Sequence, residues 1–190
     1  MVGVVLLAAV VGVPSGTLVD QVIAVVDKEV VTQSELLIEA RIALAEREGE
    51  DVASGPLAED FLQSFRDYLI NQRLIAEQAR RLGGADVAEE DVNAAMATLQ
   101  RRFRSNASYQ AFLRRFGIAP AGLRTTLRRS LRNERYMRER LRLRLMGQGS
   151  AAETEAVRYD RALRTWIDEL RAGAEIRLLG PDGELERQSP

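Results

Sequence analysis

Residues 22–37 read VIAVVDKEVVTQSELL, and this stretch decides the fold. It begins with Val22–Val26, a short run of mostly β-branched apolar residues that favours a buried strand. Asp27–Glu29 form a polar break, after which two valines resume the strand pattern, so the stretch predicts a hairpin although no glycine occupies the turn. Thr32 and Glu35 have the spacing of a capping box, which predicts a helix that begins here.

The composition limits the chemistry that the chain can perform. Its 190 residues include no cysteine and no histidine, and the net charge is −1. Thiol nucleophiles, disulfides, histidine bases and the usual zinc ligand sets are therefore absent, which leaves carboxylates, hydroxyls and arginines. An enzyme is possible with these groups but poorly equipped, and we predict no catalytic residues, no metal site and no cofactor. The length fits one domain with a substantial core.

The first residues have the character of an export signal. Residues 1–13 are almost wholly apolar, and Pro14, Ser15 and Gly16 follow them. The segment is too short to cross a membrane as an ordinary helix and is typical of a secretory signal, with cleavage after Ser15. The alternative is a buried N-terminal strand or helix. We expect residues 1–15 to be a signal peptide, which places the mature, soluble chain outside the cytoplasm.

The rest of the chain is predicted to be mainly helical, with a helix at 58–82 in the centre because its apolar face is the broadest. A loop is expected at 49–56, a polar break at 105–108, a short linker at 146–155 and a flexible polar tail at 181–190. Alternating residues at 174–179 predict a last strand. Further helices are expected at 34–48, from about 89 to 103, at 109–116, from Pro120 to Leu145 and at 156–172.

One segment concentrates the positive charge. Residues 101–145 hold 14 arginines and two glutamates, so the segment is +12 and the remainder is −13. Clustered arginines favour a surface that binds nucleic acid or another polyanion. However, Leu123, Leu127, Leu131, Met137, Leu141 and Leu145 share about a third of the helical circumference, with Glu134 and Arg138 as a pair inside the stripe. We therefore expect the helix to pack against protein and its arginines to pair with acidic residues or to stay solvated.

The order of these elements resembles a known family. The stretch at 22–37 is similar to the start of the N-terminal domain of SurA-type periplasmic chaperones. The residues Leu69, Ile70, Leu74, Ile75, Ala79 and Gly83, followed by Val87–Val92, resemble the central helix of that domain and its next, acidic helix start. Ala162–Leu179, with Trp166, Leu170, Arg171, Ala174 and Ile176, resembles the helix and strand that return to it.

The chain departs from the family pattern in two places. Ala88 stands where the family commonly has a hydroxyl residue as helix cap. One or two parvulin prolyl-isomerase domains usually lie between the long helix and the returning helix, whereas this chain has only about ten residues there, 146–155. Because the histidines of a parvulin domain are also absent, the resemblance implies no isomerase activity.

The resemblance implies a single chaperone domain at 16–180, with an N-terminal part at 20–145 and a returning helix and strand at 156–179. That domain is expected to hold unfolded outer-membrane or exported polypeptides in the periplasm, without nucleotide and with nucleic acid as a disfavoured partner. The sequence does not decide between a monomer and a homodimer.

Such a holdase needs exposed apolar surface. For the phenylalanines a core position is the favoured alternative, whereas Tyr136 and Leu143 lie opposite the packing stripe of their helix. The candidate client-binding residues are Phe103, Tyr109, Phe112, Phe116, Tyr136, Leu143 and Met146.

Overall fold

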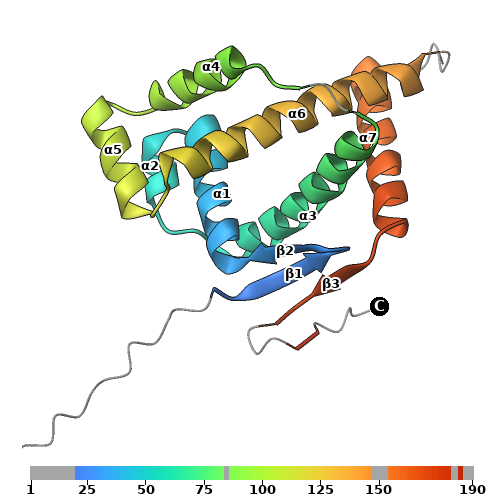
Figure 1. Ribbon diagram of the computed structural model, residues 1–190, viewed down its shortest axis with the longest axis horizontal. Coiled ribbons are helices and arrows are strands. Elements are labelled where there is room, and N and C mark those ends of the chain that lie inside the picture. Colours follow the sequence, from blue (N-terminus) through green and yellow to red (C-terminus); the bar gives the residue numbers. More distant parts are fainter. Residues whose placement is uncertain (1–19, 84–85, 147–153, 181–183, 186–190) are drawn as a thin grey trace, which may run out of the picture.

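The computed structural model describes residues 20–83, 86–146, 154–180 and 184–185, and within them the chain is mainly helical with one small sheet (Figure 1). This confirms the predicted fold class. The elements are β1 (Val22–Val26), β2 (Glu29–Thr32), α1 (Gln33–Arg47), α2 (Glu50–Ser54), α3 (Glu59–Arg81), α4 (Glu89–Gln100), α5 (Asn106–Arg115), α6 (Pro120–Leu145), α7 (Glu155–Ala172) and β3 (Ile176–Leu178).

The predicted hairpin is formed by β1 and β2. Its turn consists of Asp27 and Lys28, and Asp27 takes the place of a glycine with a φ of 53°, a left-handed conformation that aspartate tolerates better than most residues. Asp27 also holds the returning chain. Its N–H donates to the carbonyl oxygen of Glu175 at 2.8 Å, and its carboxylate accepts from the Glu175 N–H at 2.9 Å.

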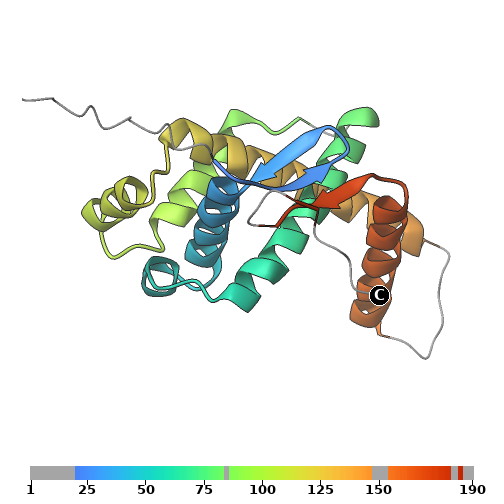
Figure 2. The ribbon, with the colours of Figure 1, turned by 90° about the horizontal axis from the view of Figure 1, so that it is seen from below.

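The two ends of the fold pair in one antiparallel sheet with the order β2-β1-β3. Ala24 lies opposite Leu178, and Val26 lies opposite Ile176. The register with β2 shifts between Val22 and Ala24, so that Ile23 and Ala24, although consecutive, are both buried. Figure 2 shows β3 leaving α7 to lie beside β1. The predicted pairing of the N-terminal hairpin with the C-terminal strand is therefore confirmed.

The first helix begins where its capping residues predict, but only half of the capping box forms. The Thr32 hydroxyl accepts from the Glu35 N–H at 3.3 Å. The Glu35 carboxylate instead binds the guanidinium of Arg73 on α3. A complete capping box occurs at Ser105 and Ser108, at the start of α5.

Two segments predicted as irregular are partly helical. Residues 49–56 contain α2, whose last carbonyls are satisfied from α1: Arg41 donates to the oxygens of Ala53 and Gly55 at 2.7 and 3.1 Å, and the Ala53 side chain is fully buried. The polar residues 105–108 are the cap and first turn of α5 rather than a break. In both cases the polar composition belongs to a helix start, which local turn signals do not distinguish from a loop.

The central position of α3 is confirmed, since it contacts α1, α6, α7 and β1. Its buried side chains join one core cluster that includes residues of β1, α1, α6 and α7. Tyr68 and Leu82, predicted on its apolar face, are instead 46% and 63% exposed. A second cluster lies between α1, α2, α4, α5 and the start of α6.

The long helix α6 buries more than its predicted packing face. Leu123, Leu127 and Leu141 are buried as expected, but Asn133 is fully buried too, and its amide donates to the backbone and side-chain oxygens of Gln72 at 3.0 and 2.9 Å. The predicted Glu134–Arg138 pair forms, yet it is exposed. The buried face therefore extends to Asn133, where α6 contacts α3.

Some of the predictions concern residues that the structure does not describe. The predicted signal peptide at 1–15 lies wholly outside the described residues, and so does most of the predicted linker at 146–155. Of the predicted tail at 181–190, Glu184 and Leu185 are described: the Gly180 N–H donates to the Glu184 oxygen at 2.8 Å, and Leu185 bridges to Leu179. No described helix has the length and hydropathy of a membrane span.

Candidate functional site

Three of the aromatic residues expected to contact clients form core instead. The side chains of Phe103, Tyr109 and Phe112 are between 4% and 7% exposed. The Phe103 ring, in the turn after α4, packs on the other two with centroids 5.3 and 5.0 Å apart. Because this turn folds back on α5, both sides of the contact are buried, and the core alternative holds for the two phenylalanines.

Phe116 and Tyr136 are half-buried between helices. The Arg41 guanidinium lies 3.8 Å from the centroid of the Phe116 ring, a cation–π contact between α1 and the end of α5. Tyr136 does not face solvent as expected from its position opposite the leucine stripe. It packs on Trp166 of α7, with centroids 6.0 Å apart. The reason is that α7 covers a second face of α6, which the periodicity of one helix does not reveal.

The remaining candidates, Leu143 and Met146, are 50% and 62% exposed at the end of α6. Val157, in the first turn of α7, is 51% exposed and was not among the predicted residues. It lies opposite Trp166 and Leu170 on the helical wheel, so the reasoning that selected Leu143 could have found it. We call Leu143, Met146 and Val157 the α6–α7 apolar residues; they flank residues 147–153 in the sequence.

A charged network joins α1, α3 and α6. Arg73 binds Glu35, and Arg129 binds Glu39, while Arg73 also lies 3.8 Å from Glu39. Burial raises the pKa of Glu39, an effect that Arg129 and Arg73 oppose. A buried carboxylate with a raised pKa is typical of catalytic sites, but here arginines bind both carboxylates, which indicates a structural cross-link between helices.

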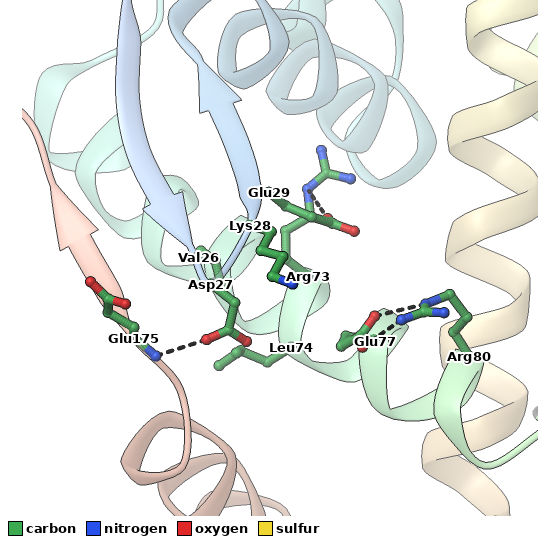
Figure 3. A pocket seen from close by; sticks show the side chains of 9 residues that line it. All are labelled: Val26, Asp27, Lys28, Glu29, Arg73, Leu74, Glu77, Arg80 and Glu175. Atoms are coloured by element: carbon green, nitrogen blue, oxygen red, sulfur yellow. Dashed lines mark hydrogen bonds and ion pairs between the residues drawn. The ribbon is translucent and has the colours of Figure 1, made fainter.

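A hollow of about 620 Å³ lies between the hairpin turn, α3 and the start of β3 (Figure 3). It contains Lys28, the only lysine of the chain. Glu77 and Arg80 pair with each other at 2.7 Å on its α3 side. Charges of both signs line it, and no described group of acidic side chains is arranged to hold a metal ion. The residues around it are Val26, Asp27, Lys28, Glu29, Arg73, Leu74, Glu77, Arg80 and Glu175.

Many arginines of the 101–145 segment are bound within the fold. Glu89, at the start of α4, binds both Arg124 and Arg128, and Arg135 binds Asp91 at 2.7 Å. These two acidic residues lie in the first turn of α4, where the N-cap, Ala88, makes no side-chain hydrogen bond and the helix dipole favours negative charge. The arginines with an ion pair are Arg104, Arg124, Arg128, Arg129, Arg135, Arg138, Arg142 and Arg144.

A comparison with known protein families supports the resemblance that the order of helices and strands suggested. The model of the SurA-like N-terminal domain matches residues 1–137, well over half of the chain. The chain belongs to this family. The matched part of the SurA-like domain ends within α6, whereas Trp166 of α7 and the strand β3 complete its core and sheet. No parvulin domain is detected in the chain. No curated protein matches it.

Proposed function

We propose that the chain is an ATP-independent periplasmic chaperone, a holdase that binds unfolded outer-membrane or exported polypeptides without isomerase activity. The observation that carries the proposal is a SurA-like domain, closed by its own C-terminal strand, that exposes large apolar side chains on α6 and α7. Isolated exposed apolar residues are ordinary, so the family supplies the direction of the argument. The α6–α7 apolar residues supply the surface that it implies.

The proposed contact surface is adaptable in its chemistry. Met146 is an unbranched, polarisable side chain that can pack on many partners, and the Arg142 guanidinium approaches its sulfur at 3.9 Å. Leu143 lies on the same last turns of α6. A client held by such contacts gains hydrophobic burial without a fixed sequence, which is what a holdase requires.

The test is the aggregation of an unfolded outer-membrane β-barrel protein diluted from urea. We expect the mature chain to reduce light scattering without nucleotide. Scattering that is unchanged at several-fold excess of the chain would overturn the proposal.

Substitutions at the exposed apolar residues test where the client binds. Replacing both Leu143 and Met146 by serine should weaken the suppression of aggregation, because about half of each side chain is exposed or more. Val52→Ser is the matched control: Val52 is 49% exposed, but it lies on α2, at the opposite end of the domain in Figure 1. Equal activity of the two variants would place client contact elsewhere.

Export is part of the proposal. The apolar residues 1–13 support a signal peptide, and cell fractionation with N-terminal sequencing of the mature protein tests it. A mature chain that starts after Ser15 and is released with the periplasmic fraction is expected. A cytoplasmic chain that retains residues 1–15 would contradict export.

Polyanion binding by the 101–145 segment remains the competing function, and the ion pairs within the fold weigh against it. DNA affinity that falls steeply with salt would support it, whereas client binding that is insensitive to salt supports the chaperone.

A further inference from the structure

We propose that the free edge of β2 is a docking site for an extended segment of the client polypeptide, which adds to the sheet as a fourth strand. This inference deepens the proposed function and rests on it. It concerns a surface distinct from the α6–α7 apolar residues. The evidence for it is the direction of the backbone N–H and C=O groups of β2.

The hydrogen-bond pattern leaves one edge of β2 unused. Asp27 in the turn and Val25 of β1 direct their backbone groups to the returning chain, as the Asp27–Glu175 bond and the pairing of Val25 with Arg177 require. The alternate residues of β1 therefore face β2. Val30 lies opposite Val25, so its N–H and C=O point away from β1, and among the described residues they have no strand partner.

The two edges of the sheet differ. Beyond β3, the chain itself turns back, and Leu185 bridges to Leu179. The β2 edge has no such cover in the described part of the chain, and the Val30 side chain is 48% exposed. Proteins usually protect an exposed strand edge with a charge, a proline or a bulge, because it pairs readily with another extended chain.

A hollow borders each end of β2. The 620 Å³ hollow of Figure 3 borders β2 at Glu29, and a second hollow of about 370 Å³ borders it at Thr32. Arg73 lines the first hollow, whereas Glu35 and Glu39 line the second, so the charged network lies between them. The Nε atom of Arg73 is buried and lies 3.9 Å from a carboxylate oxygen of Glu29, which is longer than a hydrogen bond.

These features select a polypeptide backbone as the occupant. A free N–H and a free C=O on one residue are satisfied together by an extended chain. Main-chain hydrogen bonds contribute affinity that does not depend on which side chains the client carries. This recognition suits a holdase whose clients share strand-forming segments and not a sequence.

Val30→Pro removes the outward N–H and leaves the β1–β2 ladder intact, because proline is tolerated at the edge of a sheet when its nitrogen faces outward. Val30→Thr is the matched control, since it keeps the N–H and the β-branched shape. Affinity is measured on the full mature chain by fluorescence anisotropy, with a labelled peptide of about ten residues that alternates apolar and polar side chains. A second peptide has the same side chains but methylated nitrogens at alternate amides.

We expect Val30→Pro, or methylation of the peptide, to weaken binding about tenfold, and Val30→Thr to leave it unchanged. The peptide comparison holds even if the proline variant folds poorly. Unchanged binding by Val30→Pro and by the methylated peptide would overturn the inference while wild-type suppression of aggregation keeps the proposed function. A wild-type chain that neither binds the peptide nor suppresses aggregation would overturn both. A wild-type dimer that Val30→Pro converts to a monomer would assign the edge to a second copy of the chain and also overturn the inference.

Discussion

Replacing Leu141 by alanine should show that the returning helix and the N-terminal part are one cooperative unit. Leu141 is fully buried on α6, in the same cluster as Trp166 and Leu170 of α7. Truncating a fully buried leucine costs about 2–5 kcal/mol, because transfer energy is lost and a cavity remains. We expect a loss of about 3 kcal/mol for Leu141→Ala. Leu143→Ala, two residues further along the same helix and half exposed, should cost about 0.5 kcal/mol or less.

Urea unfolding followed by two signals measures this effect. Fluorescence of Trp166, the only tryptophan, reports the docking of α7, and far-ultraviolet circular dichroism reports all helices. With a slope of about 2–3 kcal/mol per molar urea, the Leu141→Ala midpoint should fall by about 1 M. The two signals should change together in the wild type. Equal midpoints for the two variants, or separate wild-type transitions, would refute the reasoning.

Three further changes test individual contacts. Thr32→Ala should cost about 1 kcal/mol because α1 loses its cap, whereas Thr125→Ala, exposed within α6, should be nearly neutral in the same urea assay. Asn133→Ala should cost about 1–3 kcal/mol because it leaves the Gln72 oxygens without their buried donor, and a loss below about 0.5 kcal/mol would contradict that role. Burial raises the folded-state pKa of Glu39, so its contribution to stability is complete below the unfolded pKa and is lost as pH rises through the folded pKa. Glu39→Gln cannot titrate, so its Tm should rise relative to wild type as the pH increases above the ordinary carboxyl pKa of about 4, and a constant difference would count against the raised pKa.

The sheet was predictable because its determinants are local. β-Branched runs on both sides of Asp27 and alternation at 174–179 identify all three strands, and the resemblance to the SurA family supplied their pairing. The dual role of Asp27 was not predictable, since its carboxylate meets the Glu175 N–H only after the distant segment has returned.

The packing of α6 shows where periodicity ceases to be sufficient. Hydrophobic spacing identifies one stripe, and the buried Leu123, Leu127 and Leu141 follow it. Asn133 and Tyr136 lie outside that stripe and are covered by α3 and α7, respectively. A helix that contacts several neighbours buries more than its most apolar side, and a polar residue there becomes visible only through its partners.

The candidate site was predictable only in part. Leu143 and Met146 have the exposure that the sequence suggested, whereas the aromatic cluster around Phe103 is core. A pattern of large apolar residues on a short helix is the same for a client surface and for a core face. The free edge at Val30 follows from strand order, which becomes known only when β3 takes the other side of β1.

Hydrogen–deuterium exchange of the mature chain, with and without an unfolded outer-membrane β-barrel protein and in the absence of nucleotide, tests the chaperone proposal most directly. We expect slower exchange at β2, where the Val30 N–H has no strand partner among the described residues, together with protection near Leu143 and Met146. Exchange that is identical at every amide with and without the unfolded client would contradict it.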